Sequence, residues 1–107
     1  MRIAIAVATP DEGGEISRRG ARAECYLVFD ETVTLREVLQ NPFKDYDRAV
    51  GLRVADYLAG KAIDIVAAAN LGTGFTTALD AKGIRYAESE GTVDAIARDL
   101  VARFGAA

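Results

Sequence analysis

Alternating large and small apolar residues predict that the chain opens with a buried β-strand. In residues 2–8, Ile3, Ile5 and Val7 alternate with alanines. A period of two with apolar side chains on both faces is typical of a strand that helices cover on each side. The following segment, residues 9–14, contains one proline and two glycines, which end the strand in a turn.

Two more strands are predicted next, joined as a hairpin. Residues 25–29 and 33–39 are rich in apolar residues that favour strands, and the polar segment 30–32 separates them. A turn this short makes the second and third strands antiparallel. The Asn41-Pro42 pair ends the third strand.

The hydrophobic period then changes from 2 to 3.6, which predicts a helix. Its apolar face is formed by residues spaced i, i+4, i+7 and i+8, namely Val50, Val54, Tyr57 and Leu58. We expect Asp47 to cap this helix and Gly60 to end it in a left-handed conformation.

Two short apolar runs, residues 63–69 and 84–87, predict strands that alternate with two further helices. The second helix follows the turn at residues 71–74 and ends at Gly83. The third opens at residues 91–92. Asp94 in its first turn and Arg103 in its last turn match the helix dipole.

The resulting element order is strand-strand-strand-helix-strand-helix-strand-helix. A strand–helix–strand unit makes a right-handed crossover and places its two strands in parallel. We therefore predict an α/β fold in a single domain, residues 1–107. It is a ribonuclease H-like mixed sheet of about five strands, the first three in an antiparallel meander and the others parallel, with three helices on its faces.

Composition excludes several classes of protein. The chain contains no histidine, so it cannot form a Ser-His-Asp triad or a histidine metal site. A net charge of −3 argues against a nucleic-acid-binding surface, and the longest apolar stretch, residues 63–71, is too short to cross a membrane. A single cysteine excludes an internal disulfide. The single cysteine fits a reducing compartment, and the first residues lack a signal-peptide pattern. We therefore expect a cytoplasmic protein.

The turn after the predicted fourth strand is the first candidate binding site. Leu71, Gly72, Thr73 and Gly74 lie between a parallel strand and a helix. Glycines allow a ligand to approach the backbone, and free helix N–H groups favour an anion. The alternative is a tight turn that simply requires two glycines, since the sequence matches neither a dinucleotide fingerprint nor a P-loop.

Three arginines, Arg18, Arg19 and Arg22, form the second candidate site. Guanidinium groups bind phosphate, carboxylate or a polyanionic cofactor in bidentate geometry. If the first and fourth strands are parallel, the arginine loop and the glycine turn leave the same edge of the sheet. The alternative is a solvated surface loop.

Cys25 is the third candidate, with two interpretations. A lone thiol at the start of an apolar strand can be a small buried hydrophobe. Alternatively, Arg22 and its neighbours lower the pKa of the thiol, and the thiolate is a ligand for a soft metal. Two-metal nuclease chemistry is not expected, because the first strand contains no acid and Asp64 begins the fourth strand at the opposite edge.

Short motifs in a fixed order along nearly the whole chain resemble one known family. They are MRIAIAVA at residues 1–8, RAECYLVFD at 22–30, NP at 41–42, RVADYL at 53–58, VAAANLG at 66–72, GI at 83–84 and GTV at 91–93. This order resembles the dinitrogenase iron–molybdenum cofactor biosynthesis family, which includes NifX-like and NafY-like proteins and the C-terminal domain of NifB-like proteins.

The resemblance implies a ribonuclease H-like fold without nuclease carboxylates and a carrier or accessory role for iron–sulfur precursors of nitrogenase cofactor. It also implies that the backbone of the glycine turn, residues 71–74, is a binding site. Many relatives have a His-Phe-Gly segment where this chain has Arg19-Gly20-Ala21, so a ligand histidine is missing. Relatives often have an aromatic residue at the position of Cys25, which therefore inherits no ligand role.

We therefore predict a non-enzymatic carrier of an anionic iron–sulfur cluster, a precursor of the iron–molybdenum cofactor used in nitrogen fixation. Arg18, Arg19 and Arg22 would neutralise charge, the glycine turn would donate backbone amides, and Cys25 would add one thiolate. The expected partners are this metallocofactor or a small anion, and nitrogenase assembly proteins. Two alternatives remain: a small-anion or nucleotide-sensing module that uses the same cleft without metal, and a protein-interaction domain.

Overall fold

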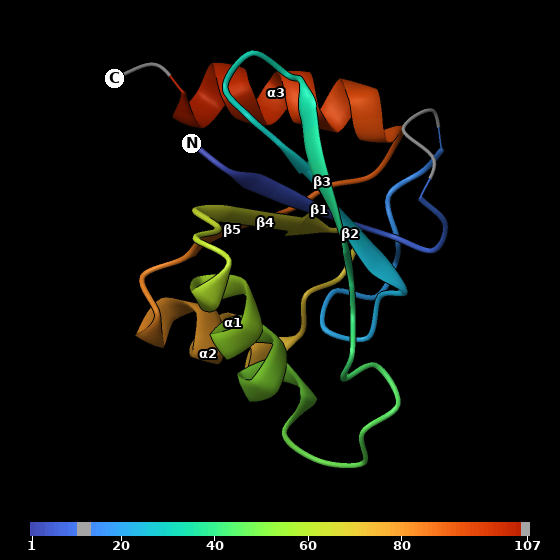
Figure 1. Cartoon of the computed structure of the whole chain (residues 1–107), viewed down its shortest axis with the longest axis vertical. Coiled ribbons are helices and arrows are strands. Elements are labelled where there is room, and N and C mark those ends of the chain that lie inside the picture. Colours follow the sequence, from blue (N-terminus) through green and yellow to red (C-terminus); the bar gives the residue numbers. More distant parts are fainter. Residues whose placement is uncertain (11–13, 106–107) are drawn as a thin grey trace.

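The computed structural model describes residues 1–10 and 14–105, and the elements follow the predicted order. They are β1 (Ile3–Val7), β2 (Cys25–Phe29), β3 (Leu35–Gln40), α1 (Val50–Gly60), β4 (Ile65–Ala68), α2 (Thr73–Ala81), β5 (Arg85–Glu88) and α3 (Val93–Phe104), as Figure 1 shows. Residues 11–13 of the predicted turn after the first strand lie outside the described residues. No helix in the described ranges combines the length and apolar character that a membrane crossing requires.

β1 is the central strand of a sheet with the order β3-β2-β1-β4-β5. It pairs antiparallel with β2 and parallel with β4, while β4 pairs parallel with β5. The predicted hairpin is present, since β2 and β3 are antiparallel. The predicted mixed sheet is confirmed. Because β1 and β4 are parallel neighbours, the segments that follow them begin at the same edge of the sheet.

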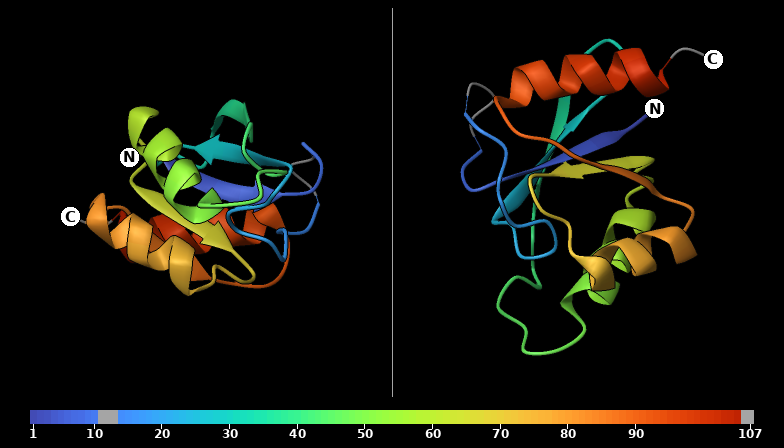
Figure 2. Two further views of the ribbon diagram at one scale, coloured as in Figure 1. Left: turned by 90° about the horizontal axis from the view of Figure 1, so that it is seen from below. Right: turned by 180° about the vertical axis from the view of Figure 1, so that it is seen from behind.

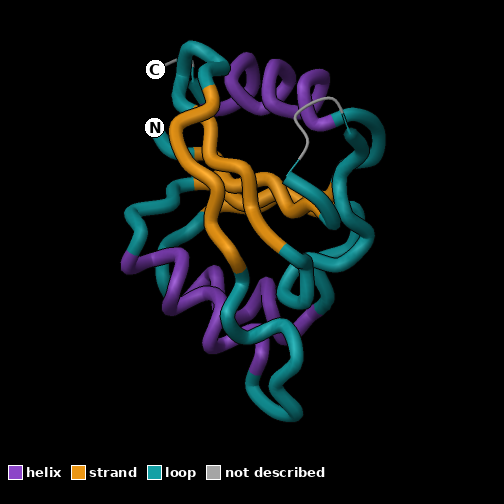
Figure 3. Tube along the Cα trace, turned by 45° about the vertical axis from the view of Figure 1, so that its right-hand side comes forward, coloured by secondary structure: helices purple, strands orange, loops and turns teal. Residues whose placement is uncertain are grey.

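Helices cover both faces of the sheet, as the chain's first strand predicts. α3 lies on one face, and α1 and α2 lie side by side on the other (Figures 1, 2 and 3). The larger side chains of β1, such as Ile3 and Ile5, belong to the core under α3, whereas Ala4 and Ala6 belong to the core under α1 and α2. All four are fully buried. Small residues on one face therefore leave room for the layer of two helices.

The start of α1 differs from the prediction. The residue before the helix is Ala49, which has a left-handed conformation (φ 57°), and its side chain offers no cap. Asp47 was expected at this position, but it lies two residues earlier and is exposed. A side-chain cap requires the residue directly before the helix to have an extended backbone, a condition that Ala49 does not meet.

The end of α1 also differs from the prediction. Gly60 is the last helical residue, and the left-handed residue is Ala62 (φ 59°). The reason is the buried Ile63, whose N–H donates to the carbonyl of Leu58 at 3.0 Å. This bond closes a Schellman motif, in which the residue before Ile63 must be left-handed. α2 ends in the same motif, with the predicted Gly83 (φ 72°) at the equivalent position.

Exchanging the residue types at these two helix ends should change stability in opposite directions. An alanine in the left-handed region costs about 1 kcal/mol relative to glycine. Ala62→Gly should therefore raise the free energy of unfolding by about 0.5–1 kcal/mol, and Gly83→Ala should lower it by about 1 kcal/mol. Urea denaturation measures both. Two changes of the same sign would contradict the assignment of the left-handed positions.

Candidate functional site

The arginine segment is anchored where β1 and β4 end. The N–H of Ser17 donates to the carbonyl of Ala6 in β1 at 2.7 Å, and the N–H of Ala69, just after β4, donates to the carbonyl of Ser17 at 2.9 Å. One residue thus bridges the ends of two parallel strands. The Ser17 hydroxyl also accepts from the N–H of Arg19 at 3.0 Å, which shapes the turn that carries the arginines.

A buried polar network holds the rest of this segment. The Tyr26 hydroxyl donates to the carbonyl of Gly20 at 2.6 Å, and the Asn41 amide donates to the carbonyls of Ala21 and Ala23 at 2.8 and 2.9 Å. Tyr26 is fully buried and Asn41 is 4% exposed. Burial raises the pKa of the Tyr26 hydroxyl above its ordinary value, so it remains a donor. The network fixes the backbone between Arg19 and Arg22.

The arginine segment packs directly on the glycine turn. A Cβ atom placed on the buried Gly20 would lie 3.1 Å from side-chain atoms of Leu71 and Phe75 and 3.2 Å from the carbonyl of Asn70. Only a glycine gives this close approach without displacing a neighbour. The two loops that we expected at one sheet edge are therefore in contact.

Between the two loops lies a concavity of about 290 Å³, which we call the arginine hollow; it is lined by Arg18, Arg19, Gly20, Ala21, Arg22, Asn70, Leu71 and Gly72. Arg18 and Arg19 are exposed, and among the described residues neither forms an ion pair. Arg22 donates through Nη1 to the carbonyl of Lys44 at 2.9 Å, which leaves its other N–H donors for a ligand. The hollow is thus positively charged.

The glycine turn supplies the other wall of the hollow and begins α2. Gly72 precedes the helix with φ 76°, and α2, all of which is described, has neither a side-chain cap nor an acidic residue in its first turn. The first N–H groups of a helix have no partner inside the helix and carry partial positive charge. Thr73 lines an adjoining concavity, which we call the polar hollow; it is lined by Asn70, Leu71, Gly72, Thr73, Thr76, Tyr86 and Glu88. Gly74 lines a different, mainly apolar hollow beside the start of α1.

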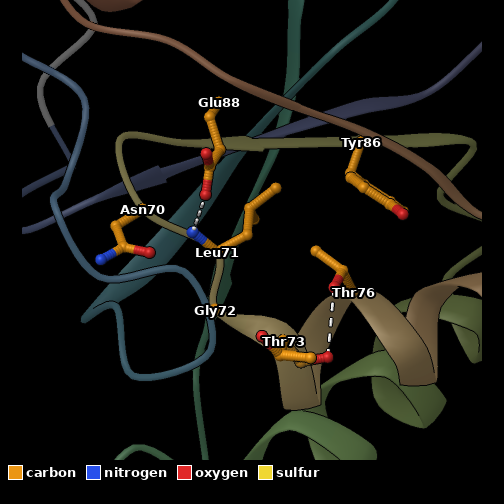
Figure 4. A pocket seen from close by; sticks show the side chains of 7 residues that line it. All are labelled: Asn70, Leu71, Gly72, Thr73, Thr76, Tyr86 and Glu88. Atoms are coloured by element: carbon orange, nitrogen blue, oxygen red, sulfur yellow. Dashed lines mark hydrogen bonds between the residues drawn. The ribbon is translucent and has the colours of Figure 1, made fainter.

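One predicted backbone donor is already occupied. The N–H of Leu71 donates to Oε2 of Glu88, the last residue of β5, at 2.9 Å (Figure 4). Sequence reasoning did not identify Glu88, although it ends the parallel strand beside β4 and so lies at the edge where the other candidate residues were sought. Tyr26 and Asn41 were also not identified as residues of the site.

Cys25 does not belong to the arginine hollow. Its side chain is fully buried in the core under α3, together with Leu27 and Phe29, and is absent from the lining of the hollow. Burial raises the pKa of the Cys25 thiol, and the charge of Glu24 adds to the shift. The predicted lowering of this pKa by Arg22 is therefore wrong, and the interpretation of Cys25 as a small buried hydrophobe describes the structure.

The chemistry available at this site is anion binding by charge and hydrogen bonds. Within residues 1–10 and 14–105, no group of three or more Cys, Asp or Glu residues is arranged to hold a metal ion. The hollow presents guanidinium groups and backbone amides, which bind anions, and it presents no thiol or imidazole to a metal.

Removing the Asn41 side chain should loosen the arginine segment. In Asn41→Ala, the carbonyls of Ala21 and Ala23 lose their donor and the N–H of Phe43 loses its acceptor, Asn41 Oδ1. The free energy of unfolding should fall by about 2–3 kcal/mol. Gln40→Ala, at the exposed neighbouring position, should change it by less than about 0.5 kcal/mol. Urea denaturation of both variants is the measurement; an equal effect would refute the anchoring role of Asn41.

Comparison with known proteins places this arrangement in a family. The family model for the dinitrogenase iron-molybdenum cofactor matches residues 1–103. The apo form of the orange protein from Desulfovibrio gigas is 29% identical with a TM-score of 0.81, and the alignment covers 96% of this chain and 85% of that one. A Thermotoga protein assigned provisionally to NifB is 30% identical with a TM-score of 0.74, covering 96% of this chain and 88% of that one.

A more distant structure shows the fold alone. A Methanocaldococcus jannaschii protein described provisionally as a dinitrogenase is 15% identical with a TM-score of 0.60, and the alignment covers 96% of this chain and 89% of that one. No curated protein matches the chain. The family match over nearly the whole sequence, together with the 30% identity to the Thermotoga protein, shows that the chain belongs to the dinitrogenase iron–molybdenum cofactor family.

Proposed function

We propose that this chain is a non-catalytic carrier that binds an anionic iron–sulfur cluster, a precursor of the iron–molybdenum cofactor, in the arginine hollow. The observation that carries the proposal is the packing of the arginine segment on the glycine turn, which gathers three guanidinium groups beside the start of α2. Family membership supports this class of cargo. Nitrogenase assembly proteins would deliver the cluster and receive it.

Charge explains how the hollow would hold such a cargo. A cluster with net negative charge would bind to Arg18, Arg19 and the free N–H groups of Arg22, while the backbone at Gly72 and the first turn of α2 would donate further hydrogen bonds. These contacts need no covalent metal–protein bond. Binding by charge alone suits a carrier, because an exposed, screened interaction can be broken when the cargo is transferred.

A second candidate function has an observation in its favour. Because Cys25 is buried away from the hollow and the chain has no histidine, the site selects for negative charge and not for metal. A small oxyanion such as phosphate, free or as part of a nucleotide, could therefore occupy the same hollow without any cluster.

An anaerobic binding experiment tests the carrier proposal. The purified protein is mixed with a dianionic, thiolate-capped iron–sulfur cluster, and visible absorption is followed on size-exclusion chromatography. We expect co-elution with the wild type and at least a tenfold loss of affinity in Arg18→Gln/Arg19→Gln, because two charge-assisted contacts are removed. Cys25→Ala should bind as the wild type does.

A matched variant controls for the change in net charge. Arg98→Gln/Arg103→Gln removes two arginines from the exposed face of α3, where they form ion pairs with Asp94 and Asp99. Its affinity should stay within about twofold of the wild type. Equal losses in both double variants, or no binding by the wild type, would contradict the carrier proposal. Binding of inorganic phosphate but not of the cluster would select the second candidate.

A further inference from the structure

Glu88 occupies the glycine turn in the way a bound anion would. It is the last residue of β5, adjacent to Ala68 at the end of β4, and its Oε2 accepts from the N–H of Leu71 at 2.9 Å. In Figure 4 the carboxylate points at this amide, at the first residue of the glycine turn. Leu71 lines both the polar hollow and the arginine hollow.

The charge of Glu88 is not matched by a basic partner. Within residues 1–10 and 14–105, no Lys or Arg forms an ion pair with it, and its side chain is exposed. The groups around it in the polar hollow are neutral: Asn70, Thr73, Thr76 and Tyr86. A negative charge therefore lies in the polar hollow, on the opposite side of the Leu71 backbone from a hollow whose charged lining residues, Arg18, Arg19 and Arg22, are all positive.

From this placement we propose that Glu88 is an internal competitor that limits how tightly and how long the arginine hollow holds its anionic cargo. The proposal rests on the proposed function. The carboxylate repels an anion in the arginine hollow across the Leu71–Gly72 backbone. The anion can accept a hydrogen bond from the Leu71 N–H only when Glu88 no longer accepts it. Glu88 thus lowers the affinity of the hollow for anions in general and shortens the time for which an anion stays bound.

The structure provides a place for the displaced side chain. The polar hollow beside Glu88 measures about 390 Å³ and is lined with hydroxyl groups. The Thr76 hydroxyl donates to the carbonyl of Thr73 at 3.1 Å, and the Tyr86 hydroxyl donates to Asp80 at 3.2 Å, so both are fixed at the wall of the hollow. Glu88 can leave the amide while its carboxylate stays in water beside polar groups, so the exchange needs no rearrangement of the fold.

The test compares Glu88→Gln with a variant that changes net charge equally. Glutamine keeps an oxygen that can accept from Leu71 but removes the charge. Asp99→Asn removes one negative charge from α3, where Asp99 forms an ion pair with Arg103. With the dianionic iron–sulfur cluster as probe, Glu88→Gln should raise affinity about three- to tenfold. Most of the gain should be a lower dissociation rate of the cluster, measured after excess phosphate is added as a competitor. Asp99→Asn should change affinity less than twofold.

Hydrogen exchange at one amide supplies a readout that does not depend on the cluster. In the free wild type the Leu71 N–H should be protected, and in Glu88→Ala it should exchange faster; added inorganic phosphate should restore its protection in that variant. Unchanged affinity and release in Glu88→Gln, with the wild type binding normally, would overturn the competitor role and leave the carrier function standing. Failure of the wild type to bind any anion would overturn both.

Discussion

The parallel pairing of β1 with β4 is the constraint on which the rest of the site depends. It sends the two following segments out of the same edge of the sheet, and the backbone of Ser17 ties them together by bonding to Ala6 and Ala69. Without this pairing the arginines and the glycine turn would lie at opposite ends of the molecule. The buried Tyr26 and Asn41 then add the rigidity that a loop of exposed arginines lacks.

The site is electrostatic, and its charges act against one another. In the proposed carrier, guanidinium groups and the start of α2 would attract an anion, while the Glu88 carboxylate in the adjoining polar hollow would repel it. Neither thiol nor imidazole reaches the hollow, so nothing in it would compete strongly for the metal of a cluster. In the proposed carrier, the arginines would attract the cargo and the nearby Glu88 carboxylate would weaken its binding. This balance would make binding reversible.

Sequence periodicity predicted the elements and the meeting of the two loops, because strand and helix patterns are local and strand–helix–strand units have a fixed hand. Periodicity did not predict the features of the site that depend on the direction of a side chain. Cys25 follows the same alternation as Leu27 and Phe29, but the sequence does not say which face of β2 carries the arginine segment. The bond between Glu88 and Leu71 depends on one side-chain conformation across two strands, which no pattern along the chain records.

The location of the bound cluster tests the central claim most directly. Crystals of the protein grown anaerobically with the dianionic iron–sulfur cluster would give an iron anomalous signal at the binding position. The account predicts a single signal between Arg18, Arg19 and Gly72, with the Glu88 carboxylate displaced from the Leu71 amide. A signal elsewhere on the surface, or one at Cys25 in an opened core, would contradict it.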